Sequence, residues 1–218
     1  MNCLDAENFC EDELQNIISG NGSVRNGETI QPIARYLRGK KEAVSQAEKA
    51  EFSKKQETQI LIGYIEENGQ WYEGEDKANY IGEGAEQKIY EFADPEFILK
   101  FNDGIFYEYW RDYFNSLLIH NYFFPHLAYE LMGFDRLDGV LYAVVKQPFV
   151  KSTEITDLGN VREFLTAMDL SIRNNDYYHP GLGIILEDIY DENVLTSDGV
   201  LQFIDTVFFL TPHFYAVE

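Results

Sequence analysis

Four short stretches of this sequence combine residue types that bind phosphate groups and metal ions. The first is Tyr80-Ile81-Gly82-Glu83-Gly84, in which two glycines follow an aromatic and an apolar residue. Glycine has no Cβ, so backbone amides at such a turn can approach a phosphate closely. A hairpin that needs glycine only for its own turn has the same pattern, and this stretch alone is therefore a weak signal.

The second stretch is an apolar run that ends in a cation, Phe97-Ile98-Leu99-Lys100. A lysine amine flanked by buried residues requires a carboxylate or a phosphate oxygen as its partner. The alternative is a lysine at a sheet edge whose amine simply reaches solvent.

The other two stretches supply carboxylates and an amide. Asp188 and Asn193 lie five positions apart in an acidic loop, and Asp205 ends the apolar run Phe203-Ile204. A carboxylate that accepts a hydroxyl proton and an amide oxygen that binds Mg²⁺ need a fixed offset of this kind. A metal-bridged phosphate would satisfy an acid at the end of a buried strand. An acidic surface loop and a turn cap are the alternatives.

Other residues that bind metals give no comparable pattern. The four histidines are scattered without metal-ligand spacing and are interpreted as structural, and the only cysteines are Cys3 and Cys10. The acidic residues of 187–192 lack the alternating ligands and the central glycine of a calcium-binding loop.

The helices and strands that must position the four stretches can be predicted from the sequence, whose composition changes near residue 70. Residues 1–70 are polar and rich in helix formers. They predict short amphipathic helices before Gly20 and Gly39 and a long helix over 42–67 that ends at Asn68-Gly69. We interpret this region as a helical accessory segment.

The rest of the chain is rich in aromatic and β-branched residues. Its patterns predict helices over 105–120 and 159–173 and strands over 80–81, 88–92, 97–101, 128–134, 140–145, 194–195 and 201–204. An antiparallel sheet with one helix, followed by a mostly helical half, is typical of an α+β two-lobed fold. The expected division is 1–70 for the accessory segment, 71–150 for the first lobe and 151–218 for a minimal second lobe.

Composition narrows the classes of partner. The net charge of −21 repels nucleic-acid backbones and anionic membranes. The sequence has no apolar run long enough to span a bilayer and no signal peptide, which favours a cytoplasmic protein. A phosphate ligand in this field would need a local cluster of donors.

The order and spacing of the four stretches resemble the protein-kinase-like superfamily over residues from about 78 to 207. Gly82-Glu83-Gly84 is similar to the glycine-rich loop, with Gln87 in place of its third glycine, and Lys100 is similar to the strand-three lysine. Asp188 and Asn193 match the catalytic-loop offset, although Leu186-Glu187 replaces its His-Arg pair. Asp205-Thr206-Val207 stands at the metal-binding Asp-Phe-Gly position.

More narrowly, the chain looks like the small serine/threonine/tyrosine kinase-like domains of polyvalent proteins from phages and conjugative elements. The segments that carry this narrower resemblance are 55–71, 84–87, 120–125 and 191–195.

The resemblance implies a site for ATP and Mg²⁺. Gly82 and Gly84 would cover the phosphates, and Lys100 would contact the α- and β-phosphates. Asp188 would deprotonate the acceptor hydroxyl, while Asn193 and Asp205 would hold Mg²⁺.

The resemblance also implies the surroundings of the nucleotide. The adenine pocket would be lined by Ile81, Ile89, Ile98 and Val145, with the backbone near Lys146-Gln147 as the hinge. The carboxylate expected to pair with Lys100 is Glu108, early in the predicted helix, and Asp112 is its rival.

The function that follows is an ATP- and Mg²⁺-dependent phosphotransferase whose acceptor is unknown. Only 13 residues follow Asp205, too few for an activation segment and a platform for a peptide substrate. This departure favours the alternative of a pseudokinase or nucleotide-binding module with a protein partner. The departures from the kinase pattern at Gln87 and at Thr206-Val207 favour the same alternative. A plain α+β domain with chance motif matches is the third possibility. The distance between the Lys100 amine and the Asp205 carboxylate discriminates it from the other two.

Overall fold

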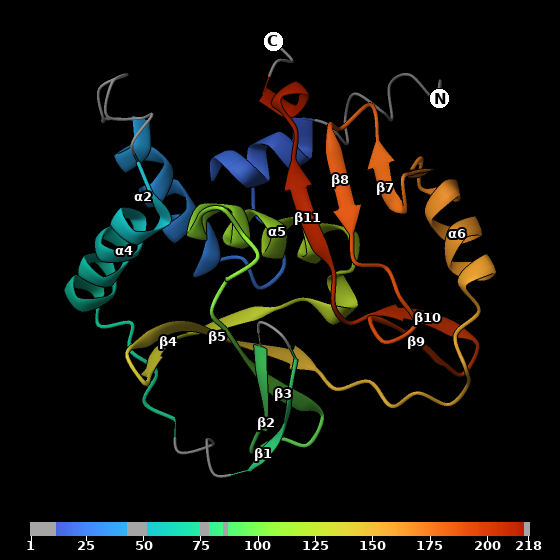
Figure 1. Cartoon of the computed structure of the whole chain (residues 1–218), viewed down its shortest axis with the longest axis horizontal. Coiled ribbons are helices and arrows are strands. Elements are labelled where there is room, and N and C mark those ends of the chain that lie inside the picture. The colour runs from blue at the N-terminus through green and yellow to red at the C-terminus, as the bar shows by residue number, and fades with distance from the viewer. Residues whose placement is uncertain (1–11, 43–51, 75–78, 85–86, 216–218) are drawn as a thin grey trace.

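A five-stranded antiparallel sheet forms one part of the molecule, shown at the bottom of Figure 1. The structure is a computed structural model that describes residues 12–42, 52–74, 79–84 and 87–215. The strand order is β1-β2-β3-β5-β4. The strands are β1 (Tyr80–Glu83), β2 (Gln87–Glu91), β3 (Phe97–Asn102), β4 (Glu130–Leu137) and β5 (Val140–Pro148). Every strand predicted in this region is present.

Turn chemistry explains why β4 and β5 form a hairpin. Leu137 pairs with Val140, and the two residues between them, Asp138 and Gly139, both have positive φ angles of 52° and 84°. Aspartate followed by glycine tolerates this conformation, whose twist matches that of the flanking strands. The predicted turn over residues 136–139 is confirmed.

Helix α5 (Trp110–Phe123) connects β3 to β4 through the short 3₁₀ helix η2 (Pro125–Leu127) and carries much of the core. The helix begins five residues later than the sequence predicted, because residues 105–109 form turns after Gly104, whose φ is +63°. The side chain of the N-cap residue, Tyr109, makes no capping hydrogen bond. Instead, the buried carboxylate of Glu57 accepts a hydrogen bond from the Trp110 backbone N–H.

Glu57 comes from α4 (Lys54–Asn68), one of the helices that precede the sheet in sequence. Ser53 caps the start of α4 through a capping box with Gln56, and Gly69 ends it in the left-handed conformation. The predicted end at Asn68-Gly69 is confirmed. The predicted start at 42 is not, since Ser53 is the N-cap; residues 43–51 lie outside the described part of the chain.

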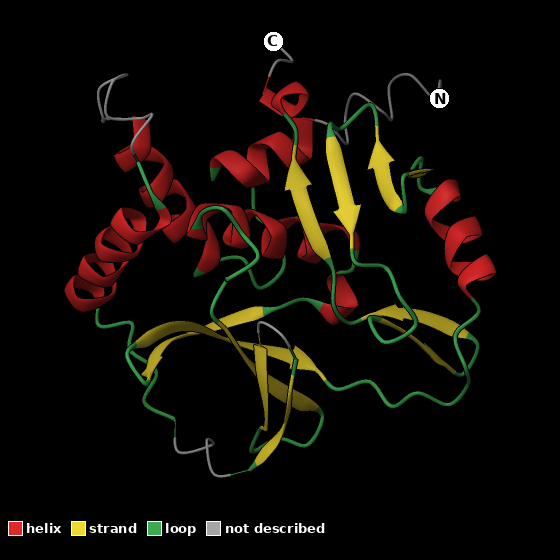
Figure 2. Ribbon diagram, viewed as in Figure 1, coloured by secondary structure: helices red, strands yellow, loops and turns green. Residues whose placement is uncertain are grey.

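The helix over 12–19 and α2 (Ile30–Glu42) also contribute to the main core. Leu14, Ile17, Ile33 and Leu37 are buried in one cluster with the apolar face of α5. In Figure 2 the helices of this region lie on one side of the five-stranded sheet. The N-terminal helices therefore pack directly on the helix that follows β3.

The C-terminal part contains more strands than the sequence predicted. Helix α6 (Leu158–Ala167) is followed by β6 (Ser171–Arg173), β7 (Asp176–His179), β8 (Ile184–Glu187), β9 (Val194–Ser197), β10 (Val200–Phe203), β11 (Val207–Leu210) and the 3₁₀ helix η3 (Pro212–Tyr215). These strands form a sheet of order β11-β8-β7-β6 and the hairpin of β9 and β10.

The helix predicted over 159–173 was wrong in its last turns. Asp169 has a φ of 60°, and Asn174 and Asn175 have φ angles of 53° and 79°, which make a tight turn between β6 and β7. The α+β fold with an antiparallel first lobe and one helix is confirmed, while the second lobe has a single α-helix among its described residues.

Candidate functional site

Lys100 and Asp205 meet between the two parts of the molecule. The Lys100 Nζ lies 3.9 Å from Asp205 Oδ2 and donates a hydrogen bond of 2.8 Å to the backbone carbonyl of Ile204. Lys100 projects from β3 and is 3% exposed, whereas Asp205 lies between β10 and β11. Two residues separated by more than 100 positions therefore form an ion pair, which the chance-match interpretation does not predict.

Asp188 and Asn193 form a second pair that is tied to the first. The Asn193 Nδ2 donates to the Asp188 backbone carbonyl at 2.8 Å and to Asp188 Oδ2 at 3.1 Å. The backbone carbonyl of Asn193 accepts hydrogen bonds from the N–H groups of Ile204 and Asp205, at 3.0 and 3.2 Å. The loop over 188–193 is thereby fixed against the segment that carries Asp205.

The backbone conformation and the carboxyl pKa of Asp188 are both unusual. Its φ of 64° is uncommon for a residue other than glycine, and such conformations gather at functional sites. Burial raises the pKa of the Asp188 carboxyl, the Asp205 carboxylate raises it further, and the hydrogen bond from Asn193 opposes both. A carboxylate near a second carboxylate, with its pKa raised, is suited to accept a proton or to bind a cation.

The donors at this point match the preferences of Mg²⁺. Two carboxylates and the Asn193 side-chain oxygen, whose amide nitrogen is already engaged by Asp188, are hard oxygen ligands. In the described residues no three His, Cys, Asp or Glu side chains form a complete metal cage. Mg²⁺ does not need one, because it is usually bound through one or two carboxylates, water and substrate phosphates.

The two glycines of the β1–β2 hairpin face open space. Neither Gly82 nor Gly84 has a positive φ, and a Cβ at Gly82 would meet no atom within 4 Å. At Gly84 the nearest atom would be Cγ of Gln87, at 4.0 Å. The conformation of these two glycines is thus open to other residues, which weakens the alternative that the hairpin alone requires them. Residues 85–86 lie outside the described part of the chain.

The carboxylate expected to reach Lys100 from the start of the helix, that of Glu108, lies elsewhere than predicted. Glu108 precedes α5, so its predicted place early in that helix was wrong. Glu108 and Asp112 both line a hollow of about 310 Å³ beside β11, and Asp112 pairs with Arg111 at 3.1 Å. Lys100 forms an ion pair with Asp205, and its pairing with Glu108 or Asp112 stays a prediction.

Helix α5 contributes His120 near Lys100. Its Nε2 donates to the Leu127 carbonyl at 3.1 Å, so Nδ1, 2.7 Å from Thr206 Oγ1, accepts from that hydroxyl. Burial lowers the pKa of His120 to about 3, and the Lys100 charge lowers it too, so the ring is neutral. This neutral contact ties the segment after Asp205 to α5.

Tyr129 also lies beside Lys100. The Lys100 amine lies 5.4 Å from the centre of the Tyr129 ring, and the Tyr129 hydroxyl donates to the same Ile204 carbonyl at 2.9 Å. Sequence reasoning missed both Tyr129 and His120, because an aromatic residue in a predicted strand and a histidine in a predicted helix are usually core residues.

The predicted adenine pocket and hinge lie on the expected strands. Val145 is buried opposite Lys100 in the register of β3 and β5, while Ile89 and Ile98 are half-buried and Ile81 is 54% exposed. The Gln147 side chain is buried and donates to the Leu127 carbonyl at 3.1 Å. Only its backbone is therefore a candidate for contact with a base, and these assignments remain predictions.

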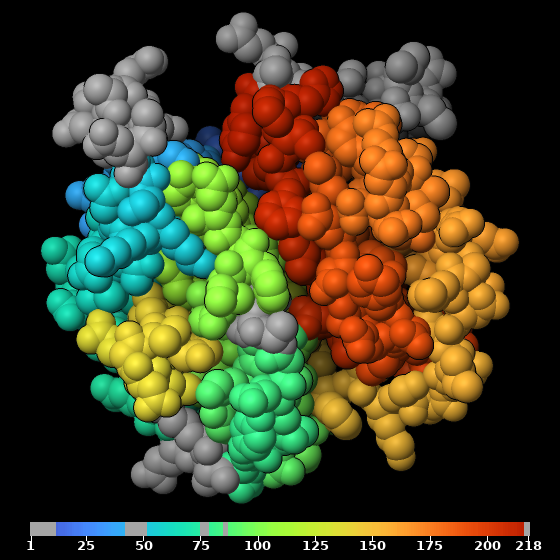
Figure 3. Space-filling model, viewed as in Figure 1, coloured from blue at the N-terminus to red at the C-terminus, as the bar shows by residue number. Residues whose placement is uncertain are grey.

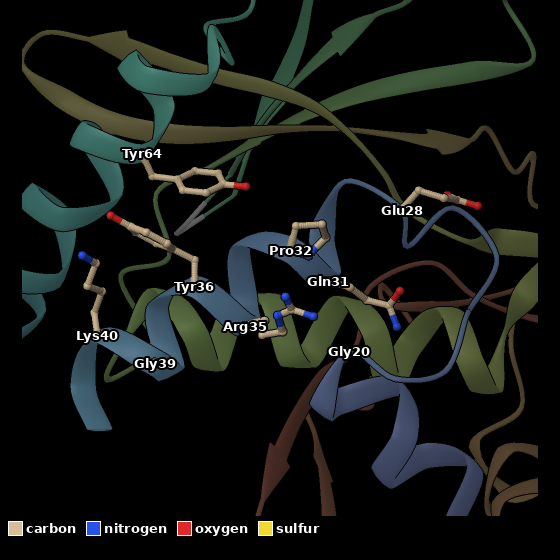
Figure 4. Close-up of a pocket in the computed structure, with 9 residues that line it drawn as sticks. All are labelled: Gly20, Glu28, Gln31, Pro32, Arg35, Tyr36, Gly39, Lys40 and Tyr64. Atoms are coloured by element: carbon tan, nitrogen blue, oxygen red, sulfur yellow. The ribbon is translucent and has the colours of Figure 1, made fainter. Parts of the chain in front are cut away.

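A larger hollow lies away from this cluster. It has a volume of about 700 Å³ and is lined by residues of α2, the Tyr64 ring of α4 and the loop between the first two helices (Figure 4). The Tyr36 and Tyr64 rings are 4.6 Å apart at one side of it. None of the predicted site residues lines this hollow, so we assign the candidate site from the converging polar groups rather than from cavity size.

In the part of the chain that the structure describes, no helix has the length and apolar character needed to cross a membrane.

The chain matches the model of a known family, and the match covers all residues of the polar cluster. The model of the serine/threonine/tyrosine kinase found in polyvalent proteins matches residues 54–212, which is more than half of the 218-residue chain. Neither the comparison with curated proteins nor that with solved structures gave a match. The match includes α4, whose Glu57 holds the start of α5. The chain therefore belongs to the family of serine/threonine/tyrosine kinases found in polyvalent proteins.

Proposed function

We propose that this protein is an ATP- and Mg²⁺-dependent phosphotransferase that uses Lys100, Asp188, Asn193 and Asp205. The observation that carries the proposal is the convergence of these residues. The Lys100 amine is 3.9 Å from the Asp205 carboxylate, and the Asn193 carbonyl links the Asp205 backbone to the loop that holds Asp188. Kinase-like family membership supports the same reaction class.

Each residue would have a separate task in the transfer. Lys100 would neutralise charge on the nucleotide phosphates, and the open face above Gly82 and Gly84 would leave room for them. Asp205 and the Asn193 side-chain oxygen would hold Mg²⁺, which supplies charge neutralisation when bound.

Asp188 would orient the acceptor hydroxyl and take its proton. The raised pKa of Asp188 favours this role, because a base is most effective when its pKa approaches the pH at which it operates. The hydrogen bond from Asn193 would keep the carboxylate directed.

Binding and transfer can be tested separately. Mg·ATP is expected to raise the melting temperature of the protein, and Asp205→Ala is expected to remove that rise. Asp188→Asn is expected to keep the rise and to lose phosphate transfer by at least about 100-fold, the usual contribution of a general base. If millimolar Mg·ATP produces no rise in the melting temperature of the wild-type protein, the proposal fails.

A nucleotide-binding module without turnover is the second candidate. It is favoured by the Gln87 side chain, which donates a hydrogen bond to an oxygen of Asp205. In that case the helices of residues 1–70 would offer the surface for a protein partner. Autophosphorylation seen by mass spectrometry in the wild type and lost in Asp188→Ala would exclude this candidate.

A further inference from the structure

The side chain of Gln87 bridges the two parts of the molecule at the candidate site. Gln87 is the first residue of β2, and its Nε2 donates a hydrogen bond to Asp205 Oδ2. The same carboxylate oxygen is the one that lies 3.9 Å from the Lys100 amine. Figure 3 shows the β1–β2 hairpin, in green, directly beside the C-terminal strands in orange and red.

This contact has a consequence for a cation at Asp205. A carboxylate oxygen that already accepts from an amide and faces an ammonium group has less electron density to offer to a metal ion. A Mg²⁺ ion that binds through Oδ2 would therefore compete with the Gln87 amide for this oxygen. Lys100 is not an obstacle in the same sense, because its amine is also held by the Ile204 carbonyl.

The contact also fixes the hairpin that would cover the phosphates. The backbone N–H of Gly84 donates to the Gln87 carbonyl at 2.9 Å, so the position of Gln87 sets the position of the glycine turn. On the opposite side, the Asp205 backbone is held by the Asn193 carbonyl at 3.2 Å. The side-chain hydrogen bond thus joins the glycine hairpin to an anchored segment.

We propose that Gln87 is a latch that holds the glycine hairpin closed on Asp205 in the nucleotide-free protein and lowers its affinity for Mg²⁺ and nucleotide. This inference rests on the proposed function, and it assigns a specific role to the residue at the third-glycine position of the loop. Release of the latch exposes Asp205 Oδ2 and lets the hairpin rise.

Calorimetric titration with magnesium and a non-hydrolysable ATP analogue tests the latch. We expect Gln87→Ala to bind the analogue about tenfold more tightly than the wild type. The reason is that the net free energy of a hydrogen bond to a charged group corresponds to about a tenfold change in the dissociation constant. Gln87→Gly is expected to do the same. Glu91→Ala, an exposed change at the other end of β2, is the matched control and should bind like the wild type.

Amide hydrogen exchange in the nucleotide-free protein provides the second measurement. Exchange at residues 80–83 and 87–91 is expected to be several-fold faster in Gln87→Ala than in the wild type and in Glu91→Ala. Unchanged exchange would overturn the latch, even if no variant binds nucleotide. Equal or weaker binding by Gln87→Ala, in a protein whose wild type binds the analogue, would also overturn it. Absence of binding in the wild type would instead refute the proposed function.

Discussion

Removal of the Glu57 side chain should destabilise the protein through the start of α5. The Glu57 carboxylate accepts a hydrogen bond from the backbone N–H of Trp110, which α5 itself leaves without an intrahelical acceptor. Loss of an N-cap costs about 1 kcal/mol, and a buried donor left unsatisfied costs about 1–3 kcal/mol. We therefore expect Glu57→Ala to lower the free energy of unfolding by about 2–3 kcal/mol.

Thermal unfolding measures this effect. For a chain of this length a loss of 1 kcal/mol lowers the melting temperature by roughly 2–4 °C, so Glu57→Ala should melt about 4–12 °C below the wild type. Glu57→Gln keeps an oxygen acceptor and should recover most of the loss. Glu66→Ala, an exposed change on the same helix, is the control. Equal melting temperatures for Glu57→Ala and Glu66→Ala would refute the assignment of Glu57 as the cap.

The pKa of Glu57 also predicts the direction in which the free energy of unfolding changes with pH. Burial raises the pKa of Glu57 in the folded protein above its ordinary value, so the folded state binds a proton more readily than the unfolded chain does. The stability associated with Glu57 is therefore greatest at low pH and declines as the pH rises through the folded pKa. Urea unfolding should show this decline in the wild type and not in Glu57→Gln.

Three further changes probe the candidate site. The pKa of His120 is about 3 in the folded protein and 6.5 in the unfolded chain, so the free energy of unfolding should fall as the pH drops below about 6.5. Urea unfolding should show a smaller fall in His120→Gln. Tyr129→Phe removes the hydroxyl that donates to Ile204 and should lower the free energy of unfolding by about 1 kcal/mol, or the melting temperature by about 2–4 °C. Gly82→Ala should keep the melting temperature of the free protein within about 1 °C of the wild-type value, since the added Cβ would meet no atom within 4 Å. Calorimetry should show weaker nucleotide binding by this variant, because the Cβ would stand where the backbone approaches the phosphates. An equal affinity would contradict the phosphate-covering role.

Patterns that repeat along the chain made the first lobe predictable from the sequence. The apolar run of β3 and the Asp138-Gly139 turn indicated the strands and one hairpin, and the spacing of Asp188, Asn193 and Asp205 indicated the polar cluster. The sequence also indicated that Lys100 needs an acidic partner. Each of these signals is local, because its residues lie close together in the sequence, the widest being the stretch from Asp188 to Asp205.

Contacts between distant residues account for most of what sequence reasoning missed. Glu57 caps a helix 53 positions away, and Gln87 reaches across 118 positions to Asp205. The helical interpretation of 159–173 failed for a local reason, because Asn174-Asn175 is a turn signal that the pattern of apolar residues obscured. Glu108 was misplaced because the helix start depends on the distant Glu57 and not on its own flanking residues.

The Asn193 carbonyl, which accepts from two successive N–H groups, has a mechanical consequence. It makes the loop of Asp188 and the segment of Asp205 parts of one rigid body, so the two acidic residues must move together. In the proposed function, any opening of the site would then take place at the hairpin and would leave the separation of the two acidic residues unchanged. The acidic pair would consequently be preorganised for the ligand, with little reorganisation of these groups needed for the proposed reaction.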